Sequence, residues 1–185
     1  MAEEARLIVE RLRADSEGVA AAWQVQAAAL PDGWTEAMLV AELNQEAGRY
    51  WLGRLGSGEA VAVGGYWRIV DEAHLVLLAV HPRAQGRGLG TALLAHLMGE
   101  ARRETRHMTL EVRESNRPAL ALYTKFGFTA LGRRPRYYGE EDALILWTPR
   151  IDTPAYAVHL AELRSASGWC LVGNESGSPG EERVP

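Results

Sequence analysis

Three glycines stand within five residues at positions 86 to 90, in the stretch PRAQGRGLGTALL (82–94). Glycine loses more backbone freedom on folding than any other residue, so this cluster predicts a loop that a bulky group approaches closely. A buried apolar run precedes the loop, and a helical apolar pattern follows it. The first turn of a helix carries unpaired N–H groups and a positive dipole end, which bind anions. The stretch therefore predicts a phosphate-binding loop; the alternative is a glycine-rich turn that binds no ligand.

Two common phosphate loops do not fit this stretch. A Walker A loop needs a Lys-Ser/Thr pair after its last glycine, whereas Gly90 is followed by Thr91 and Ala92. A Rossmann fingerprint needs the pattern Gly-x-Gly-x-x-Gly, and the spacing of Gly86, Gly88 and Gly90 differs from it. Both classes of nucleotide-binding protein are therefore excluded.

A second stretch, LEVRESNRPALALYTKFGF (110–128), contains groups that can handle protons. Glu111 lies in a predicted strand, and its carboxylate can accept a proton from an amine, directly or through water. An ion pair with Arg113 explains Glu111 equally well. Tyr123 lies on the following helix, either as a phenolic acid or as a core aromatic. Asn116 is placed to cap that helix, which is compatible with an additional contact to a ligand.

These residues are positioned by a predicted mixed α/β sheet. The predicted strands cover residues 7–13, 50–55, 60–70, 73–80, 108–113, 128–133 and 142–148, and the continuous apolar run at 73–80 is typical of a strand buried on both faces. Two helices are predicted in the N-terminal part: one is capped by Ser16, and one begins at Thr35 and ends at Gly48. Three further helices are predicted over residues 89–103, 116–126 and 157–163. The polar stretch NESGSPGEERVP (174–185) is predicted to be disordered.

The glycine loop, read as Gln85-x-x-Gly88-x-Gly90, resembles the pyrophosphate loop of the GCN5-related N-acetyltransferases, the GNAT family. The combination of LEVRESN, ALYTKFGF and RRPRYY resembles the RimI-type branch, which acetylates the N-terminal alanine of a small-subunit ribosomal protein. The resemblance spans residues 7–149. It implies a mixed, mostly antiparallel sheet with helices on both faces and splayed central strands. Residues 1–150 then form the acetyltransferase domain, and 151–185 form a C-terminal extension with a short helix and a disordered tail.

The resemblance implies a role for each matching residue. Glu111 matches the general base and Tyr123 matches the general acid. The residues that match the acetyl-CoA site are Leu78, Ala79, Val80, Gln85, Gly86, Arg87, Gly88, Leu89, Gly90, Thr91 and Asn116. Tyr137 and Tyr138 match the region that borders the acceptor. One departure is His81, which stands where an acidic residue is expected before Pro82.

The implied reaction moves an acetyl group directly from acetyl-CoA to a protein N-terminal amine in a ternary complex. Deprotonation at pH 7 costs roughly 1 to 1.4 kcal/mol for an α-amine and about 4.6 kcal/mol for lysine. A single carboxylate therefore favours an N-terminal acceptor. Transfer to a small-molecule amine or a lysine is one alternative, and a binding module that holds acetyl-CoA without catalysis is another.

Composition narrows the class of protein. The 185 residues are 47% hydrophobic and 24% charged, as in a soluble domain, and the net charge of −4 argues against a nucleic-acid partner. A single cysteine, Cys170, cannot form an intramolecular disulfide and favours a reducing compartment. The start MAEEAR does not resemble a signal peptide, no apolar run is long enough to span a membrane, and the histidines lack metal-ligand spacing. We expect a cytoplasmic enzyme without a metal, of open oligomeric state.

Overall fold

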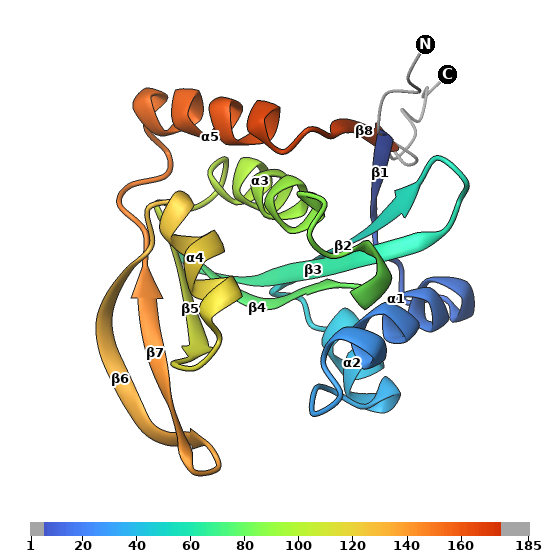
Figure 1. The fold of residues 1–185 in the computed structure, drawn as a ribbon, viewed down its shortest axis with the longest axis horizontal. Coiled ribbons are helices and arrows are strands. Elements are labelled where there is room, and N and C mark those ends of the chain that lie inside the picture. The colour runs from blue at the N-terminus through green and yellow to red at the C-terminus, as the bar shows by residue number, and fades with distance from the viewer. Residues whose placement is uncertain (1–5, 175–185) are drawn as a thin grey trace, which may run out of the picture.

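The computed structural model describes residues 6–174, which form one mixed sheet with helices on both faces (Figure 1). The strands are β1 (Arg6–Arg11), β2 (Gly48–Leu55), β3 (Ala60–Ile69), β4 (Glu72–Val80), β5 (His107–Arg113), β6 (Thr129–Tyr138), β7 (Glu141–Trp147) and β8 (Cys170–Asn174). The helices are α1 (Ser16–Ala29), α2 (Glu36–Leu43), α3 (Leu89–Ala101), α4 (Arg117–Lys125) and α5 (Pro154–Ala166), with a short 3-10 turn η1 (Pro82–Ala84). The strand order is β6-β7-β5-β4-β3-β2-β1-β8, and among the described strands only β4–β5 and β1–β8 are parallel neighbours. The predicted fold class is confirmed.

The alternation of side chains along each strand divides the core into two layers. On one face Leu97 and Met98 of α3 pack with Leu110 of β5, in a cluster that also includes residues of α4. On the other face Leu39 of α2 packs with Leu77 of β4. Each fully buried leucine stabilises the fold by about 1.5–3 kcal/mol, so both layers fix their helices to the sheet. The centre of the sheet therefore has α3 and α4 on one side, with α1 and α2 on the other.

The two central strands β4 and β5 separate from each other. Within the described residues, their parallel pairing begins at Glu72 with His107 and ends at His74 with Thr109. The register of β4 against β3 shifts nearby and leaves Val76 without a partner on β3. A bulge of this kind bends a strand and changes the direction of its side chains. The predicted splay of the central strands is confirmed, and it opens a gap in the middle of the sheet.

The starts of two helices test the sequence-based caps. Asn116 caps α4 as predicted, because its side-chain oxygen accepts from the N–H of Ala119 at 3.2 Å. Ser16 does not cap α1. The cap is Asp15, whose carboxylate accepts from the N–H of Gly18 at 2.8 Å. Aspartate and serine are both favoured at this position, so the sequence alone leaves the choice between neighbours open.

Two predicted boundaries on the sheet are wrong. Gly48 begins β2 and does not end α2. Residues 134–138, predicted as a polar connection, continue β6 along β7. The pairing with β7 shifts register in this part, and Pro135 is tolerated because β6 is an edge strand.

The chain after residue 150 forms more structure than predicted. Helix α5 is longer than the predicted 157–163, and Thr153 caps it by accepting from the N–H of Tyr156 at 3.2 Å. Residues 170–174 form the unpredicted strand β8, which pairs in parallel with β1. This pairing joins two parts of the chain that are distant in sequence, so the residues around β8 do not indicate it. The predicted disordered tail falls, apart from Asn174, on residues 175–185, which lie outside the described residues.

Candidate active site

The glycine loop joins β4 to α3, and its backbone conformation requires glycine. Gly86 (φ 74°) and Gly88 (φ 82°) lie in the left-handed region, which side chains disfavour. Gly88 is the N-cap of α3, and no side chain of the described chain caps this helix end. The first N–H groups of α3 are therefore available to an external acceptor. The side-chain amide of Gln85 donates to the carbonyl of Val80 at 2.9 Å and closes the base of the loop.

His81 stands where an acidic residue is expected before Pro82, and it can cap the turn that follows. Its Nδ1 accepts from the N–H of Arg83 at 3.4 Å and caps the short turn η1. Acceptor side chains at this position satisfy a backbone donor in the same way. The departure at His81 therefore leaves the entry to the loop intact.

A cavity of about 410 Å³ lies beside the loop, between the end of β4 and α4. This volume is within the range of small-molecule sites. Its lining contains the predicted cofactor-binding residues Leu78, Ala79, Val80, Gln85, Gly86, Gly88, Leu89, Gly90 and Asn116. Further lining residues are Ala29, Leu30, Pro118, Ala119, Leu122 and Tyr123. Arg87 and Thr91 are not among the lining residues of the described chain.

The cavity suits a ligand with an anionic part and an apolar part. The open N–H groups of α3 lie at the loop, while Leu78, Val80 and Leu122 supply apolar wall. A Cβ built at Gly86 would meet no atom within 4 Å, so the loop leaves room for a bulky group against its backbone. These residues fit a diphosphate followed by an apolar arm.

Tyr123 has features of both roles that the sequence left open, a core aromatic and a phenolic acid. Its ring packs 5.5 Å from that of Phe128 and its side chain is only 8% exposed. Its hydroxyl has no hydrogen-bond partner within residues 6–174, and the residue lines the cavity. Burial, with a smaller contribution from Tyr138, raises the pKa of Tyr123. The phenol therefore keeps its proton near neutral pH, as an acid must.

Glu111 lies on the other face of the sheet. Its neighbours Leu110 and Val112 belong to the core beneath α3, and successive side chains of a strand point to opposite faces. The carboxylate is 11% exposed, with Oε2 2.8 Å from Nε2 of His74 and Oε1 3.2 Å from the guanidinium of Arg134. Both oxygens are thus held. The base candidate faces α1 and α2, and it is not among the residues that line the cavity.

The suggested ion pair between Glu111 and Arg113 is wrong. Arg113 contacts Glu141 at 3.5 Å, and its guanidinium lies 4.4 Å from the ring centroid of Tyr138. Arg134 is the arginine that pairs with Glu111 instead of Arg113. It lies on β6, which continues past the predicted end of that strand. The error in the strand boundary and the error in the ion pair thus have one cause.

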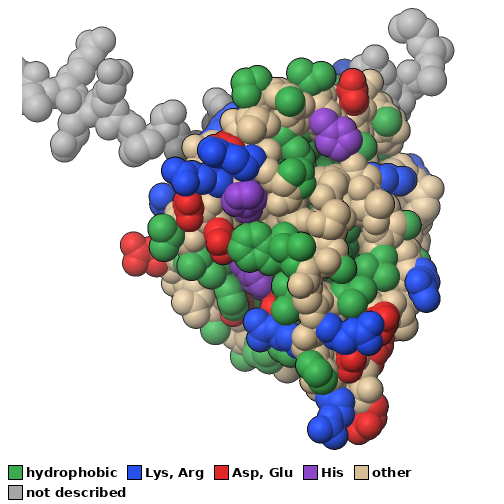
Figure 2. Space-filling view, turned by 90° about the vertical axis from the view of Figure 1, so that its left-hand side faces the viewer, with side chains coloured by type: hydrophobic (Ala, Val, Ile, Leu, Met, Phe, Trp, Pro, Cys, Tyr) green, Lys and Arg blue, Asp and Glu red, His purple; other side chains and the backbone are tan. Residues whose placement is uncertain are grey.

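The two tyrosines at the end of β6 lie beside Glu111. The hydroxyl of Tyr138 donates to the backbone carbonyl of Glu111 at 3.3 Å. Tyr137 is 50% exposed, and the guanidinium of Arg134 lies 5.5 Å from its ring centroid. The face that carries β6 and β7 presents basic and acidic side chains next to one another around apolar ones (Figure 2). The structure therefore brings the predicted acceptor residues to the Glu111 side of the sheet.

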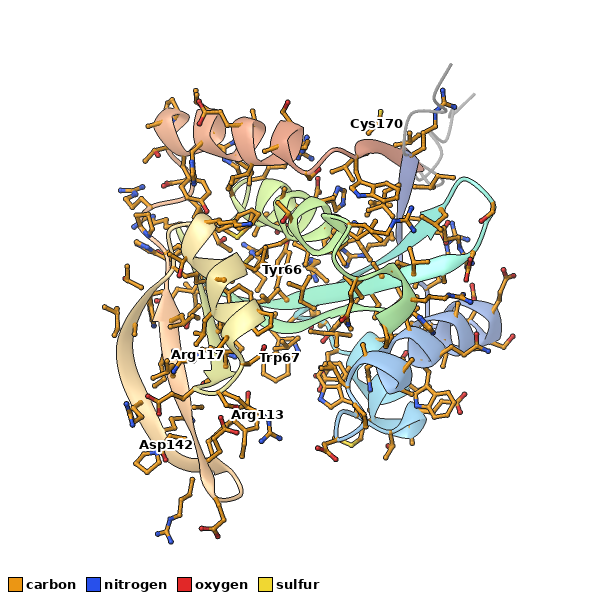
Figure 3. The ribbon with its side chains drawn as sticks, in the orientation of Figure 1. Tyr66, Trp67, Arg113, Arg117, Asp142 and Cys170 are labelled. Carbon is orange, nitrogen blue, oxygen red and sulfur yellow. The ribbon has the colours of Figure 1, made fainter. Side chains whose placement is uncertain are left out.

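A row of side chains that the sequence analysis missed extends from Glu111 across this face. The rings of Trp67 and His74 stack with their centroids 6.0 Å apart. Nε1 of Trp67 and the hydroxyl of Tyr50 both donate to Oε2 of Glu42, each at 2.9 Å. In Figure 3 Trp67 projects from the sheet on the side of α1 and α2. These residues come from separate elements, and only the pairing of Trp67 with His74 across β3 and β4 could have indicated them.

The described residues offer no second site for other chemistries, whether as a cluster of metal ligands, a membrane-spanning helix or a cysteine beside Glu111. Within residues 6–174, no His, Cys, Asp and Glu side chains gather in a group of three or more that could hold a metal. None of the helices in that range is both long and apolar enough to cross a bilayer. Cys170 is exposed in β8, which β1, β2, β3 and β4 separate from β5. An acetyl group on Cys170 would therefore have to cross the sheet to reach Glu111.

The loop, the cavity and the splayed strands define an acetyltransferase. The acetyltransferase (GNAT) family model matches residues 19–128, which include the glycine loop, β5 and α4. The chain belongs to this family, and it is an acetyl-CoA-dependent N-acetyltransferase.

Its relatives include enzymes that act on protein N-termini. The ribosomal protein bS18-alanine N-acetyltransferase of Salmonella typhimurium is 39% identical over 137 residues, which are 70% of this chain and 89% of the relative. The N-alpha-acetyltransferase RimI of Mycobacterium tuberculosis is 37% identical over 111 residues, 58% of this chain and 68% of the relative. The crystal structure of the ribosomal-protein-S18-alanine N-acetyltransferase from Escherichia coli superposes with a TM-score of 0.71 at 32% identity, over 78% of this chain and 94% of that one. The resemblance to the RimI-type branch is confirmed.

Proposed function

We propose that this chain acetylates the N-terminal alanine of a small-subunit ribosomal protein in the cytoplasm. The relatives that act on bS18 support this acceptor. The observation that carries the proposal is a site with two sides. The glycine loop, the end of β4, α4 and the last residues of α1 line the cavity, whereas Glu111 lies on β5 outside this lining, and β4 and β5 separate between the two. Donor and acceptor then meet without sharing an entrance.

The cofactor side holds the donor mainly through backbone groups. Acetyl-CoA supplies an acetyl group already activated as a thioester. The N–H groups of residues 86–91 bind its diphosphate, with Arg87 and Thr91 contributing through their backbone. The edge of residues 78–80 that faces β5 has no strand partner within the described chain, so its backbone groups can pair with the arm of the cofactor. Asn116 caps α4 and contacts the cofactor from the cavity wall.

The acceptor side removes a proton from the substrate. Glu111 accepts this proton from the acceptor ammonium, directly or through water, and the neutral amine attacks the acetyl carbon. Tyr137 and Tyr138 border the peptide. An α-amine has a pKa of about 7.7–8.0 and lysine one of about 10.4, so a carboxylate needs far less help with the N-terminal acceptor.

Tyr123 completes the transfer from the cofactor side. The bond between the acetyl carbon and sulfur breaks and the sulfur takes the phenolic proton of Tyr123. The nitrogen of the new amide releases its extra proton through water, and the phenolate of Tyr123 regains a proton from solvent. The raised pKa of Tyr123, caused first by burial, means that the phenol is protonated at neutral pH when the thiolate leaves.

Mass analysis of acceptor peptides tests the proposal. The purified chain is incubated with acetyl-CoA and a peptide that begins with alanine and contains an internal lysine, alongside the same peptide with a blocked N-terminus and a polyamine. We expect one acetyl group, located by fragmentation on the α-amine, and no reaction of the blocked peptide or the polyamine. Equal acetylation of the blocked peptide would establish a lysine acceptor, and no transfer to any amine would indicate a binding module.

A further inference from the structure

We infer that residues 151–174, here the C-terminal segment, hold the glycine loop in its cofactor-binding conformation, with Trp169 as a positioning residue. This inference rests on the proposed function only in that the loop binds coenzyme A. The segment lies beyond the family match at residues 19–128. The Escherichia coli structure is covered over 94% of its length by 78% of this chain, so part of this chain has no counterpart there.

Trp169 contacts the loop from the side away from the cavity. Its Nε1 donates to the backbone carbonyl of Arg87 at 2.6 Å. The guanidinium of Arg87 lies 5.4 Å from the centroid of the indole ring, and Trp169 is only 9% exposed. The indole therefore holds both the backbone and the side chain of one loop residue, and the side chain of Arg87 is turned out of the cavity.

The hydrogen bond to Arg87 fixes the direction of a neighbouring donor. In a trans peptide the C=O and the following N–H point in opposite directions, and the chain contains no cis peptide among its described residues. Because the carbonyl of Arg87 points to Trp169, the N–H of Gly88 points away from it. Gly88 lines the cavity. Trp169 thus orients a peptide whose N–H faces the cofactor.

The backbone of the segment also blocks movement of the loop. A Cβ built at Gly88 would lie 2.3 Å from the carbonyl oxygen of Ser167, so loop and segment are in direct backbone contact. Ser167 is itself fixed at the end of α5, where its Oγ donates to the carbonyl of Arg164 at 2.7 Å. The loop therefore cannot move away from a bound ligand without displacing α5.

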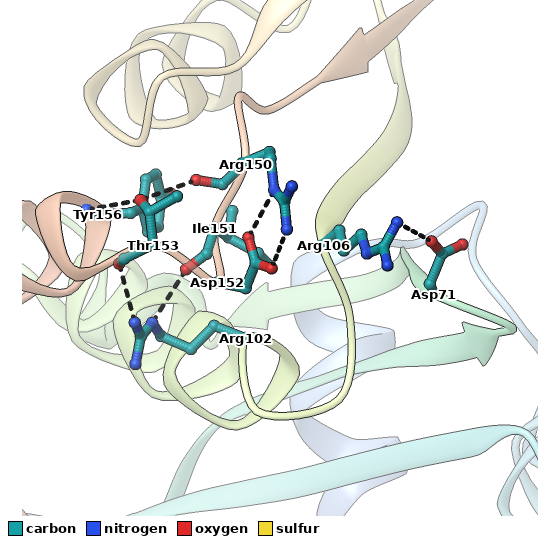
Figure 4. Close-up of polar contacts among 8 residues, drawn as sticks. All are labelled: Asp71, Arg102, Arg106, Arg150, Ile151, Asp152, Thr153 and Tyr156. Carbon is teal, nitrogen blue, oxygen red and sulfur yellow. Dashed lines mark hydrogen bonds and ion pairs between the residues drawn. The ribbon is translucent and has the colours of Figure 1, made fainter.

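The other end of the segment is anchored to α3 and to the end of α4. Arg102, the C-cap of α3, donates to the carbonyls of Ile151 and Thr153, each at 3.0 Å (Figure 4). The hydroxyl of Tyr156 donates to the carbonyl of Phe126 at 2.8 Å. The segment thus connects two elements beside the cofactor cavity to the outer side of the loop.

The substitution Trp169→Phe tests the positioning role, because it keeps an aromatic ring at this position and removes the indole N–H. A neutral hydrogen bond is worth a factor of about two to ten in an equilibrium. We expect the Kd of coenzyme A, measured by calorimetry, and the KM of acetyl-CoA to rise by about that factor. The kcat and the KM of the acceptor peptide stay unchanged, because Glu111 and its neighbours are untouched.

Tyr156→Phe is the matched control. It also removes one buried hydrogen bond between the segment and a backbone carbonyl, but that carbonyl belongs to Phe126 and not to the loop. We expect it to lower the thermal unfolding midpoint about as much as Trp169→Phe and to leave the affinity for coenzyme A unchanged. Hydrogen exchange of the amides of residues 86–90 in the ligand-free full-length chain should become faster in Trp169→Phe alone.

Two results would overturn the inference. Wild-type affinity and wild-type exchange in Trp169→Phe would show that the loop keeps its conformation without the indole. Equal weakening of coenzyme A binding by both variants would show that the segment acts only through overall stability. Failure of the folded wild-type chain to bind coenzyme A would instead refute the proposed function, while the exchange experiment would still test the contact.

Discussion

The two faces of the sheet beside the β4–β5 gap are built in different ways. The cofactor face takes its binding groups from short continuous stretches, residues 78–80 and 85–91, and uses much backbone. The acceptor face is assembled from single side chains on separate elements: Glu42, Trp67, His74, Glu111 and Arg134. A continuous stretch leaves a motif in the sequence, and an assembled face leaves none. The difference also means that variants of the two faces should change different kinetic constants.

Glu111→Gln should have the largest effect, because it removes the proton acceptor of the acceptor face. We expect kcat/KM to fall about 10³-fold. The affinity for coenzyme A should stay unchanged, since Glu111 does not line the cavity. Steady-state rates and calorimetry measure the two quantities. Loss of coenzyme A binding together with the rate would contradict the separation of the two faces.

Tyr123→Phe tests the chemical contribution of the cofactor face and should lower kcat about 10²-fold. The KM of acetyl-CoA should change little, because the ring packing against Phe128 is kept. Burial raises the pKa of Tyr123 above its usual value of about 10. In the wild type we therefore expect no loss of kcat from this group below pH 10. A loss of kcat near pH 8 that disappears in Tyr123→Phe would contradict this assignment.

His74→Asn tests whether the acceptor face depends on the contact that holds Glu111. The shorter amide cannot replace Nε2, which lies 2.8 Å from the carboxylate. Hydrogen bonds to charged groups are worth about 1.5–3 kcal/mol, so we expect kcat to fall about tenfold or more at unchanged acetyl-CoA KM. His74→Gln, with a longer amide donor, should restore part of the rate.

His107→Asn is the matched control for His74, because it makes the same substitution at the closed end of the gap. We expect it to keep wild-type kinetics. A loss as large as that of His74→Asn would show that the effect comes from general disturbance of β4 and β5.

His96→Leu should have the smallest effect on activity and a defined effect on stability. Its Nε2 is buried without a hydrogen-bond partner in the described chain, and burial, then Arg164 and Arg103, lower its pKa to about 4. In the unfolded chain the pKa is about 6.5. The unfolded state therefore binds the proton more tightly, and the free energy of unfolding should fall as the pH drops from 6.5 to 4.

Urea unfolding over this pH range measures the effect of His96. The wild type should lose on the order of 3 kcal/mol more than His96→Leu between pH 6.5 and 4. Identical pH dependence of the two proteins would show that folding leaves the pKa of His96 unchanged. Activity near pH 7 should be the same in both, because His96 lies outside the cavity lining and the acceptor face.

The sequence predicted those parts of the site whose geometry is local. The glycine loop and the cap at Asn116 depend on neighbouring residues. The structure confirms the cap and places the loop between β4 and α3, with Gly86 and Gly88 at positive φ. The partners of Glu111 depend on the parallel pairing of β4 with β5 and on how far β6 extends along β7, where the register shifts. No period-two pattern reports such a shift. Strand β8 was missed for a similar reason, because its partner β1 lies near the other end of the chain.

A structure of the chain with coenzyme A linked covalently to the amine of a peptide that begins with alanine tests the central claim most directly. We expect the diphosphate against the N–H groups of residues 86–90 and the peptide beside Glu111 and Tyr138, with the link passing between β4 and β5. A peptide that leaves on the face of α4, or a diphosphate bound away from the loop, would contradict the account.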